Sequence, residues 1–283
     1  MRAPPPLRPE IVAHYTRLAR EQSRFRSPRG QLEFERSKEL ILRFLPRHRA
    51  VIYDVGGGPG TYAFWLTQLG HEVHLVDPVP FHIRQARKRA KREPRSAPAE
   101  IVPGDARRLP LSSSSADVVL LMGPLYHLPK EPDRRLALAE AFRVLKPGGL
   151  LIGVGVTRFT SMMDGSWEGY LSDPGFVRIV QRDLTTGEHR NPKDIPAYWT
   201  TAFFAHPREL AREVRSAGFR VKGTFAIEGF VWWVPGLRRK WLDPMFRSRL
   251  LHMLRATERE PTLIGMGPHI MSVARKPIAR RRM

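Results

Sequence analysis

A glycine-rich turn between two apolar runs is the feature that most constrains the fold. Residues 54–60 spell DVGGGPG, and they lie between the apolar run 50–55 and a second one, EVHLVD, at 72–77. Glycine at this density has an entropic cost and is typical of places where the backbone turns sharply or approaches a ligand. The pattern predicts a buried strand, then a helix over 61–70 that stops at Gly70, then a second strand.

The same alternation continues along most of the chain. Further helices are predicted over 81–93, 132–146 and 206–219, and further strands over 100–105, 116–123, 150–156, 220–230 and 268–276. Strands that alternate with helices predict a parallel sheet covered on both faces. Two more helices are expected ahead of the first strand, over 11–27 and 31–45. Residues 158–205 break the rhythm and predict an insertion lying over the sheet.

The turn and the acid after it predict a nucleoside-binding site. Ligands of open parallel sheets bind beyond the carboxyl ends of the strands. Gly56, Gly58 and Gly60 follow the first strand, and Asp77 ends the second, where its carboxylate can accept hydrogen bonds from both ribose hydroxyls. A looser dinucleotide pattern, G-x-G-x-x-A, fits the register that ends at Ala63, so a nicotinamide cofactor stays open.

Several stretches resemble motifs of the class I S-adenosylmethionine-dependent methyltransferases. DVGGGPG resembles their motif I and HLVD their second motif, while GDARRLPLSSSSADVVLLM, MGPLYHL and AFRVLKPGGLL resemble later ones. The resemblance covers residues 50–157, resumes at 206–276, and is nearest to the bacterial small-molecule branch. It implies an α/β, Rossmann-like, doubly wound and mostly parallel sheet of seven strands with the last strand antiparallel, with N-terminal helices and an insertion after strand five.

The resemblance implies S-adenosylmethionine as the cofactor and suggests its contacts. The three glycines of the turn would pass under its methionine portion and sugar, and Asp77 would hold the ribose. Asp105 and the backbone of Ala106 would bind the adenine. Asp54 would orient the turn, and Met122 would line the site near the sulfonium.

Methyl transfer from a sulfonium is an in-line displacement, so much of its catalysis is positioning. A general base is needed only if the acceptor must lose a proton. His127, after the fourth strand, is the first candidate because an ordinary histidine pKa suits proton transfer near neutrality. A structural role for His127 is the alternative. Tyr126 would line the methyl donor or belong to the core, and Tyr15 would close over the cofactor or pack its own helix.

The insertion supplies the candidates for an acceptor pocket. Arg158, Trp167, His189 and Tyr198 lie in or beside it, and each could instead serve packing or lie at the surface. The aromatic residues of the insertion favour an apolar or aromatic small molecule as the acceptor. No group of His, Asp and Glu has a spacing typical of a metal site, so no metal is predicted.

The charge of the chain leaves further partners open. The net charge is +21, and 39 of the 48 basic residues are arginine, which genome composition alone could produce. Basic clusters at 84–95 and 280–282 keep a nucleic acid open as a partner, and with it an RNA methyltransferase. An NAD(P)-dependent oxidoreductase, or a module that binds the cofactor without catalysing a reaction, also stays open.

We expect three regions: a helical cap over 1–48, a methyltransferase domain over 49–276 whose insertion 158–205 forms a substrate lid, and a basic tail over 277–283. The chain has no cysteine, which excludes disulfides and thiolate metal sites. It shows neither a long apolar run nor a secretory signal, so a cytoplasmic enzyme without a membrane span is expected.

Overall fold

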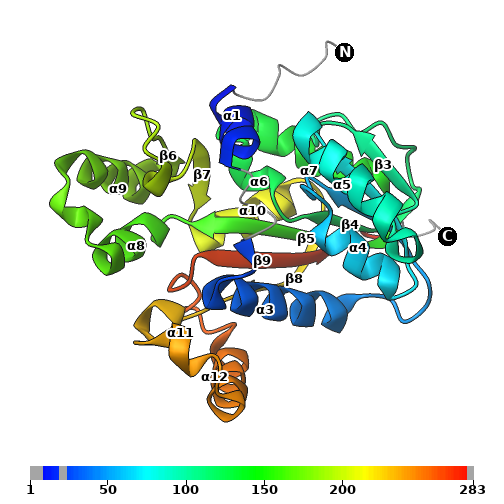
Figure 1. Ribbon diagram of the computed structural model, residues 1–283. Helices are drawn as coiled ribbons and strands as arrows, with labels where there is room; N and C mark the ends of the chain where they lie inside the picture. The colour runs from blue at the N-terminus through cyan, green and yellow to red at the C-terminus, as the bar shows by residue number, and fades with distance from the viewer. Residues whose placement is uncertain (1–8, 19–23, 279–283) are drawn as a thin grey trace.

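The computed structural model describes residues 9–18 and 24–278, and Figure 1 shows their arrangement. The arginine run 280–282, most of the expected basic tail and part of the helix expected over 11–27 lie outside the described residues.

A twisted, mostly parallel sheet forms the centre of the molecule. The strand order confirms the predicted fold, because five parallel strands are followed by the antiparallel β9 and then by β8, which pairs with β9. These seven strands are, across the sheet, β3 (Glu100–Pro103), β2 (Glu72–Asp77), β1 (Val51–Val55), β4 (Ala116–Leu121), β5 (Leu145–Thr157), β9 (His269–Arg275) and β8 (Arg220–Ala226).

Helices cover both faces of this sheet, as the alternation predicted. One face packs against α3 (Pro28–Phe44), α4 (Thr61–Gln68) and α5 (Pro80–Arg92), and the other against α7 (Glu131–Val144) and α10 (Pro207–Ser216). Successive residues of β5 alternate between the two cores, Ile152 facing the first and Leu151 the second. Both faces are therefore buried, which explains why the strands are continuous apolar runs.

The insertion is only partly the layer over the sheet that the sequence predicted. It contains α8 (Thr160–Glu168) and α9 (Pro174–Thr186), which lie to one side of the sheet in Figure 1. Its two short strands, β6 (Glu188–His189) and β7 (Ala202–Ala205), join the sheet instead. Strand β7 pairs in parallel with the last residues of β5, beyond the point where β4 ends, so the whole sheet has nine strands.

Three more elements complete the fold. Helix α1 (Pro9–Leu18) and the short α6 (Pro124–His127) lie near the carboxyl ends of the strands. The connection from β8 to β9 holds α11 (Leu237–Lys240) and α12 (Pro244–Thr257), which the sequence pattern did not predict and which project away from the sheet. Among the described residues, every helix is too short or too polar to cross a lipid bilayer.

Candidate functional site

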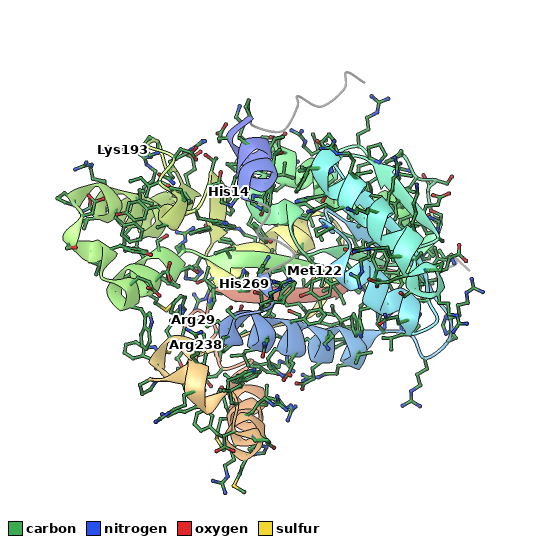
Figure 2. The ribbon with its side chains drawn as sticks, in the orientation of Figure 1. His14, Arg29, Met122, Lys193, Arg238 and His269 are labelled. Atoms are coloured by element: carbon green, nitrogen blue, oxygen red, sulfur yellow. The ribbon has the colours of Figure 1, made fainter. Side chains whose placement is uncertain are left out.

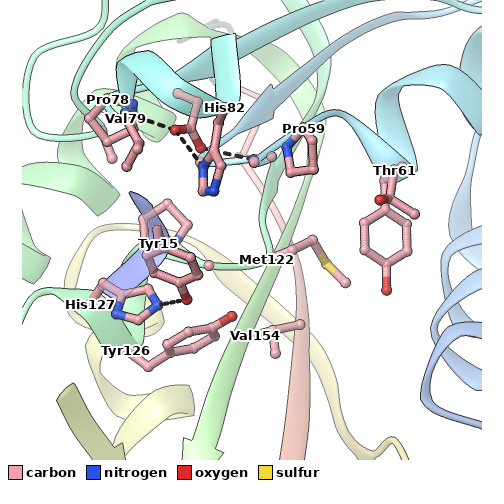
Figure 3. Close-up of a pocket in the computed structure, with 18 of the residues that line it drawn as sticks. Tyr15, Pro59, Thr61, Pro78, Val79, His82, Met122, Tyr126, His127 and Val154 are labelled. Atoms are coloured by element: carbon pink, nitrogen blue, oxygen red, sulfur yellow. Dashed lines mark hydrogen bonds and ion pairs between the residues drawn. The ribbon is translucent and has the colours of Figure 1, made fainter. Parts of the chain in front are cut away.

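A pocket opens at the carboxyl ends of β1, β2 and β4, under α1. Its walls come from the glycine turn, from the segment after β2 and from α6, as Figure 3 shows. Nine of the residues predicted to act at the site line it: Tyr15, Gly56, Gly58, Asp77, Asp105, Ala106, Met122, Tyr126 and His127. The structure therefore brings together, around one cavity, residues that are spread over 112 positions of the chain.

The glycine turn needs its glycines for two different reasons. Gly56 has φ +67°, and a Cβ there would lie 2.5 Å from the Cγ atom of Pro124, so a side chain has no room. Gly58 has φ +59°, and a Cβ there would make only an ordinary van der Waals contact with the His82 ring, whose nearest atom is 3.8 Å away. The backbone at Gly58 is therefore bare toward the pocket. Gly60, φ +88°, begins α4 and is part of the turn rather than of the pocket wall.

The Asp77 carboxylate is buried and fixed by the turn beside it. The backbone N–H of Gly58 donates to its Oδ2 at 2.8 Å, and the N–H of Val79 donates to its Oδ1 at 2.8 Å. The Nδ1 atom of His82 lies 3.1 Å from the same Oδ1. Only 3% of Asp77 is exposed. These contacts hold a carboxylate at the end of β2 and orient it toward the pocket that it lines.

Asp54 lies beneath the turn rather than in the pocket wall. Its carboxylate is fully buried, and within the described part of the chain neither oxygen has a hydrogen-bond partner of good geometry. Burial raises the pKa of Asp54 to about 7, and the charge of Asp77 adds to the rise, while the backbone N–H of Ala63 opposes it. This acid is poised to ionise when a cation approaches the turn.

Asp105 lines the pocket at the end of β3, but its carboxylate already has a partner. The Arg107 side chain donates to both of its oxygens, from Nε at 3.0 Å and from Nη2 at 2.7 Å. The backbone N–H of Arg107 donates to Oδ1 at 2.8 Å. Arg107 thus orients the acid predicted to bind adenine. Ala106 and Met122 also line this pocket.

His127 and Tyr15 meet across the pocket. The Oη atom of Tyr15, on α1, lies 2.6 Å from the Nε2 atom of His127, and Figure 3 marks this contact. Burial lowers the pKa of His127 to about 3, and the nearby His14, Arg24 and His82 add to the decrease. This value differs from the near-neutral one that the sequence suggested. The imidazole is therefore neutral at physiological pH, and it anchors α1 over the pocket.

Comparisons with known proteins assign the chain to a family. Residues 53–153 match the family described as "Methyltransferase domain". The ubiquinone/menaquinone biosynthesis C-methyltransferase UbiE of Dinoroseobacter shibae is 36% identical over 118 residues, which is 41% of this chain and 46% of that protein. The enzyme of the same name from Cereibacter sphaeroides strain ATCC 17029 is 30% identical over 190 residues, 64% of this chain and 71% of that protein. The chain belongs to the class I S-adenosylmethionine-dependent methyltransferases.

Solved structures show the same fold. A methyltransferase from Methanosarcina mazei has a TM-score of 0.56 at 19% identity, and the match covers 85% of this chain and 98% of that one. A methyltransferase from Thermotoga maritima has a TM-score of 0.55 at 17% identity, over 94% and 99% of the two chains. The chain spans about half the length of several of the curated relatives that it matches.

These matches confirm the predicted family, fold and cofactor of this methyltransferase. Nothing in the comparisons favours an RNA substrate or a nicotinamide cofactor. Most of the basic residues of α5 are exposed, including Arg84, Arg87 and Lys88, and they lie outside the described wall of the pocket.

Of the four residues predicted to line an acceptor pocket, two lie in a second cavity next to the first. His189 and Tyr198 line it, together with Trp199 and Phe204 of the insertion. Arg158 instead forms an ion pair with Glu209 on α10, and Trp167 is 48% exposed beside Arg29. Neither of these two residues lines the first or the second cavity.

Sequence reasoning missed the polar residues between the two cavities. Arg24 and Glu33, from the N-terminal segment, line both cavities, and Glu228 and His269 line the second. Ligand atoms of Glu33, Glu228 and His269 lie within 4.8 Å of one another, a cluster that no sequence spacing shows. The sequence did contain one signal for the pair Glu228 and His269. Glu228 follows β8 and His269 begins β9, and because these strands run antiparallel side by side, the end of β8 lies next to the start of β9.

Proposed function

We propose that this methyltransferase transfers the methyl group of S-adenosylmethionine to a small-molecule acceptor. The observation that carries the proposal is the pairing of a bare backbone at Gly58 with a fixed, buried carboxylate at Asp77, in one pocket at the switch point of the sheet. When bound, S-adenosylmethionine supplies an activated methyl group on a sulfonium, so the protein's task is largely to orient the two partners.

The residues present fit that cofactor. The open side of Gly58 leaves room for a ligand against the backbone, and the acceptor oxygens of Asp77 suit ribose hydroxyls. The unpaired, buried carboxyl of Asp54 suits the neighbourhood of a cationic amino group, which would favour its ionised form. Asp105 and Ala106 would bind the adenine, and Met122 would lie near the sulfonium.

A small acceptor is supported by the shape of the site. Helix α1 covers the pocket, with Ile11 and Tyr15 in its wall, and the insertion supplies ten of the 21 residues that line the neighbouring cavity. Both features enclose a ligand rather than present an open groove to a polymer. The names of the UbiE relatives point the same way, since ubiquinone and menaquinone are small molecules. A cytoplasmic location remains a prediction.

Two calorimetric titrations test the proposal. We expect S-adenosylhomocysteine to bind the purified chain with one site, and NAD to show no saturable heat. Binding of NAD but not of S-adenosylhomocysteine would overturn the cofactor assignment. A rate of methyl transfer that falls steeply with added salt would instead favour a nucleic-acid acceptor.

A further inference from the structure

The second cavity adjoins the cofactor pocket through shared walls. Arg24 and Glu33 line both. Val154 lines the first and Val156 the second, and these residues lie on the same face of β5, one two-residue repeat or about 7 Å apart. The ring of Tyr126, in the first pocket, lies 6.5 Å from the ring of His269, and Figure 2 shows His269 and Met122 both near the centre of the molecule. The second cavity is therefore a direct neighbour of the cofactor pocket, and a ligand in it would lie beside that pocket.

A Glu–His pair lies at this junction. The Nδ1 atom of His269 lies 2.6 Å from Oε1 of Glu228, and the backbone N–H of His269 donates to Oε2 at 3.1 Å. Only 2% of Glu228 is exposed, so water does not compete for these two hydrogen bonds. Since a carboxylate can only accept, the pair assigns the ring proton to Nδ1 and leaves Nε2 as the acceptor that faces Arg24.

The electrostatic surroundings of His269 differ from those of His127. Burial lowers the pKa of His269, but the charges of Glu228 and Glu33 and the hydrogen bond that His269 donates to Glu228 outweigh that effect, even with Arg24 opposing them. The pKa of His269 is therefore raised above its ordinary value. A raised pKa makes the neutral imidazole of His269 the stronger base, whereas the imidazole of His127, with its pKa of about 3, is a weak one.

Arg24 already supplies the cation of this cluster. Its Nε donates to Oε2 of Glu33 at 3.2 Å, its Nη2 contacts Oε1 of the same residue, and Nη2 also lies 3.4 Å from Nε2 of His269. A guanidinium in contact with two of the three possible ligands argues against a metal ion in the same place. The 3.4 Å contact is at the limit of a hydrogen bond, so an acceptor's hydroxyl could replace it at little cost.

We propose that the second cavity binds a hydroxylated aromatic acceptor and that His269, oriented by Glu228, is the general base that removes its hydroxyl proton. This inference rests on the proposed function. Arg24 would then stabilise the oxyanion that forms. The aromatic body is matched by the aromatic side chains of the cavity, which are Phe176, Tyr198, Trp199, Phe204 and Trp232.

The step balances without any further reactant. The acceptor's O–H bond breaks, its proton goes to Nε2 of His269, and its electron pair stays on the phenolate, shared between the oxygen and the adjacent ring carbons. The attacking atom forms a bond to the methyl group while the methyl–sulfur bond breaks, its electron pair passing to sulfur. When the oxygen attacks, the proton held on Nε2 of His269 is afterwards released to water. When a ring carbon attacks, that carbon loses its ring proton to water, and the oxygen takes back the proton from Nε2, which restores the phenol and the neutral imidazole.

The test uses 4-nitrophenol, whose neutral and ionised forms absorb at different wavelengths. The probe is titrated with pH on protein saturated with S-adenosylhomocysteine, so that the cofactor pocket is filled. We expect the bound probe to ionise at least about tenfold more readily, or one pH unit lower, than the probe in solution. The His269→Asn variant should lose this shift, Glu228→Gln should reduce it, and His252→Asn, an exposed histidine on α12, should keep it.

Several outcomes would overturn the inference. These are a probe that ionises alike on the wild-type protein and on His269→Asn, a probe that does not bind saturably, and an ionisation that requires added Mg²⁺, which would assign the cluster to a metal. If His269→Asn fails to fold, Glu228→Gln decides, since it retains the imidazole. Failure of the wild-type chain to bind S-adenosylhomocysteine is a separate result, because it would refute the proposed function itself.

Discussion

Replacing Asp77 by asparagine tests the ribose assignment with the least change of shape. The carboxylate accepts from Gly58 on one oxygen and from Val79 on the other, at 2.8 Å each. Asparagine offers one acceptor oxygen, so one of these N–H groups will face an NH₂ group. We expect the free energy of unfolding to fall by about 1–3 kcal/mol, the usual cost of a buried donor without a partner.

The effect on cofactor binding follows from the lost charge. A hydrogen bond to a charged group contributes about 1.5–3 kcal/mol, so losing one ribose contact should raise the Kd for S-adenosylhomocysteine roughly 10- to 150-fold. Isothermal titration calorimetry measures this directly, at a temperature where circular dichroism shows the variant to be folded.

Asp117→Asn is the matched control. Asp117 accepts from the Val51 N–H and from Lys146 at 2.8 Å each. It lies near the start of β4, at the end of the strands opposite to the pocket. It should lose stability with an unchanged Kd. If the folded Asp77→Asn variant binds S-adenosylhomocysteine within about twofold of the wild-type affinity, the ribose assignment is refuted.

Three further predictions concern the same pocket. Gly58→Ala and Gly70→Ala both place a side chain at positive φ, so each should lose about 1–2 kcal/mol of stability in denaturant titrations. Only Gly58→Ala should raise the Kd for S-adenosylhomocysteine, by about tenfold or more. Equal Kd values for the two variants would contradict the close approach of the ligand at Gly58. Asp54→Asn tests a pH dependence of stability. The pKa of Asp54 in the folded chain, about 7, lies above its ordinary value of 3.8, so the stability that the protonated acid contributes is lost as pH rises from 3.8 to 7. Without ligand, the Tm of the variant should therefore match that of the wild type near pH 4 and exceed it at pH 8. A wild-type Tm at pH 8 equal to that of the variant would show that the acid is not destabilised by burial. Tyr15→Phe removes the 2.6 Å contact with His127 and should cost about 1–3 kcal/mol, seen as a lower Tm; an unchanged Tm would show that this contact does not anchor α1.

The fold, and the place of the glycine turn and Asp77 at the ends of neighbouring strands, were predictable because their signals are local. The glycine turn and Asp77 are less than 25 residues apart, and each follows an apolar strand whose direction fixes where its end lies. The seven-stranded sheet with its antiparallel last strand was predicted from the family resemblance, and the structure confirms it. Strand β7 could not be predicted, because a four-residue strand pairs only with the part of β5 that extends past β4.

The chemistry between the pockets was not readable from the sequence, because it depends on burial and on long-range contacts. His127 and His269 are the same residue type, yet a buried position without a carboxylate partner lowers the pKa of one, while Glu228 and Glu33 raise that of the other. Arg158 and Trp167 were plausible by composition alone. Only the packing of α10 and of Arg29 shows where they lie.

The most direct test of the central claim is a crystal structure of the chain with S-adenosylhomocysteine. The account predicts electron density across the carboxyl ends of β1 and β2, with the sugar hydroxyls on the Asp77 carboxylate and the amino-acid tail against the backbone of residues 56–58. Density for the ligand elsewhere, or a sugar that points away from Asp77, would contradict it.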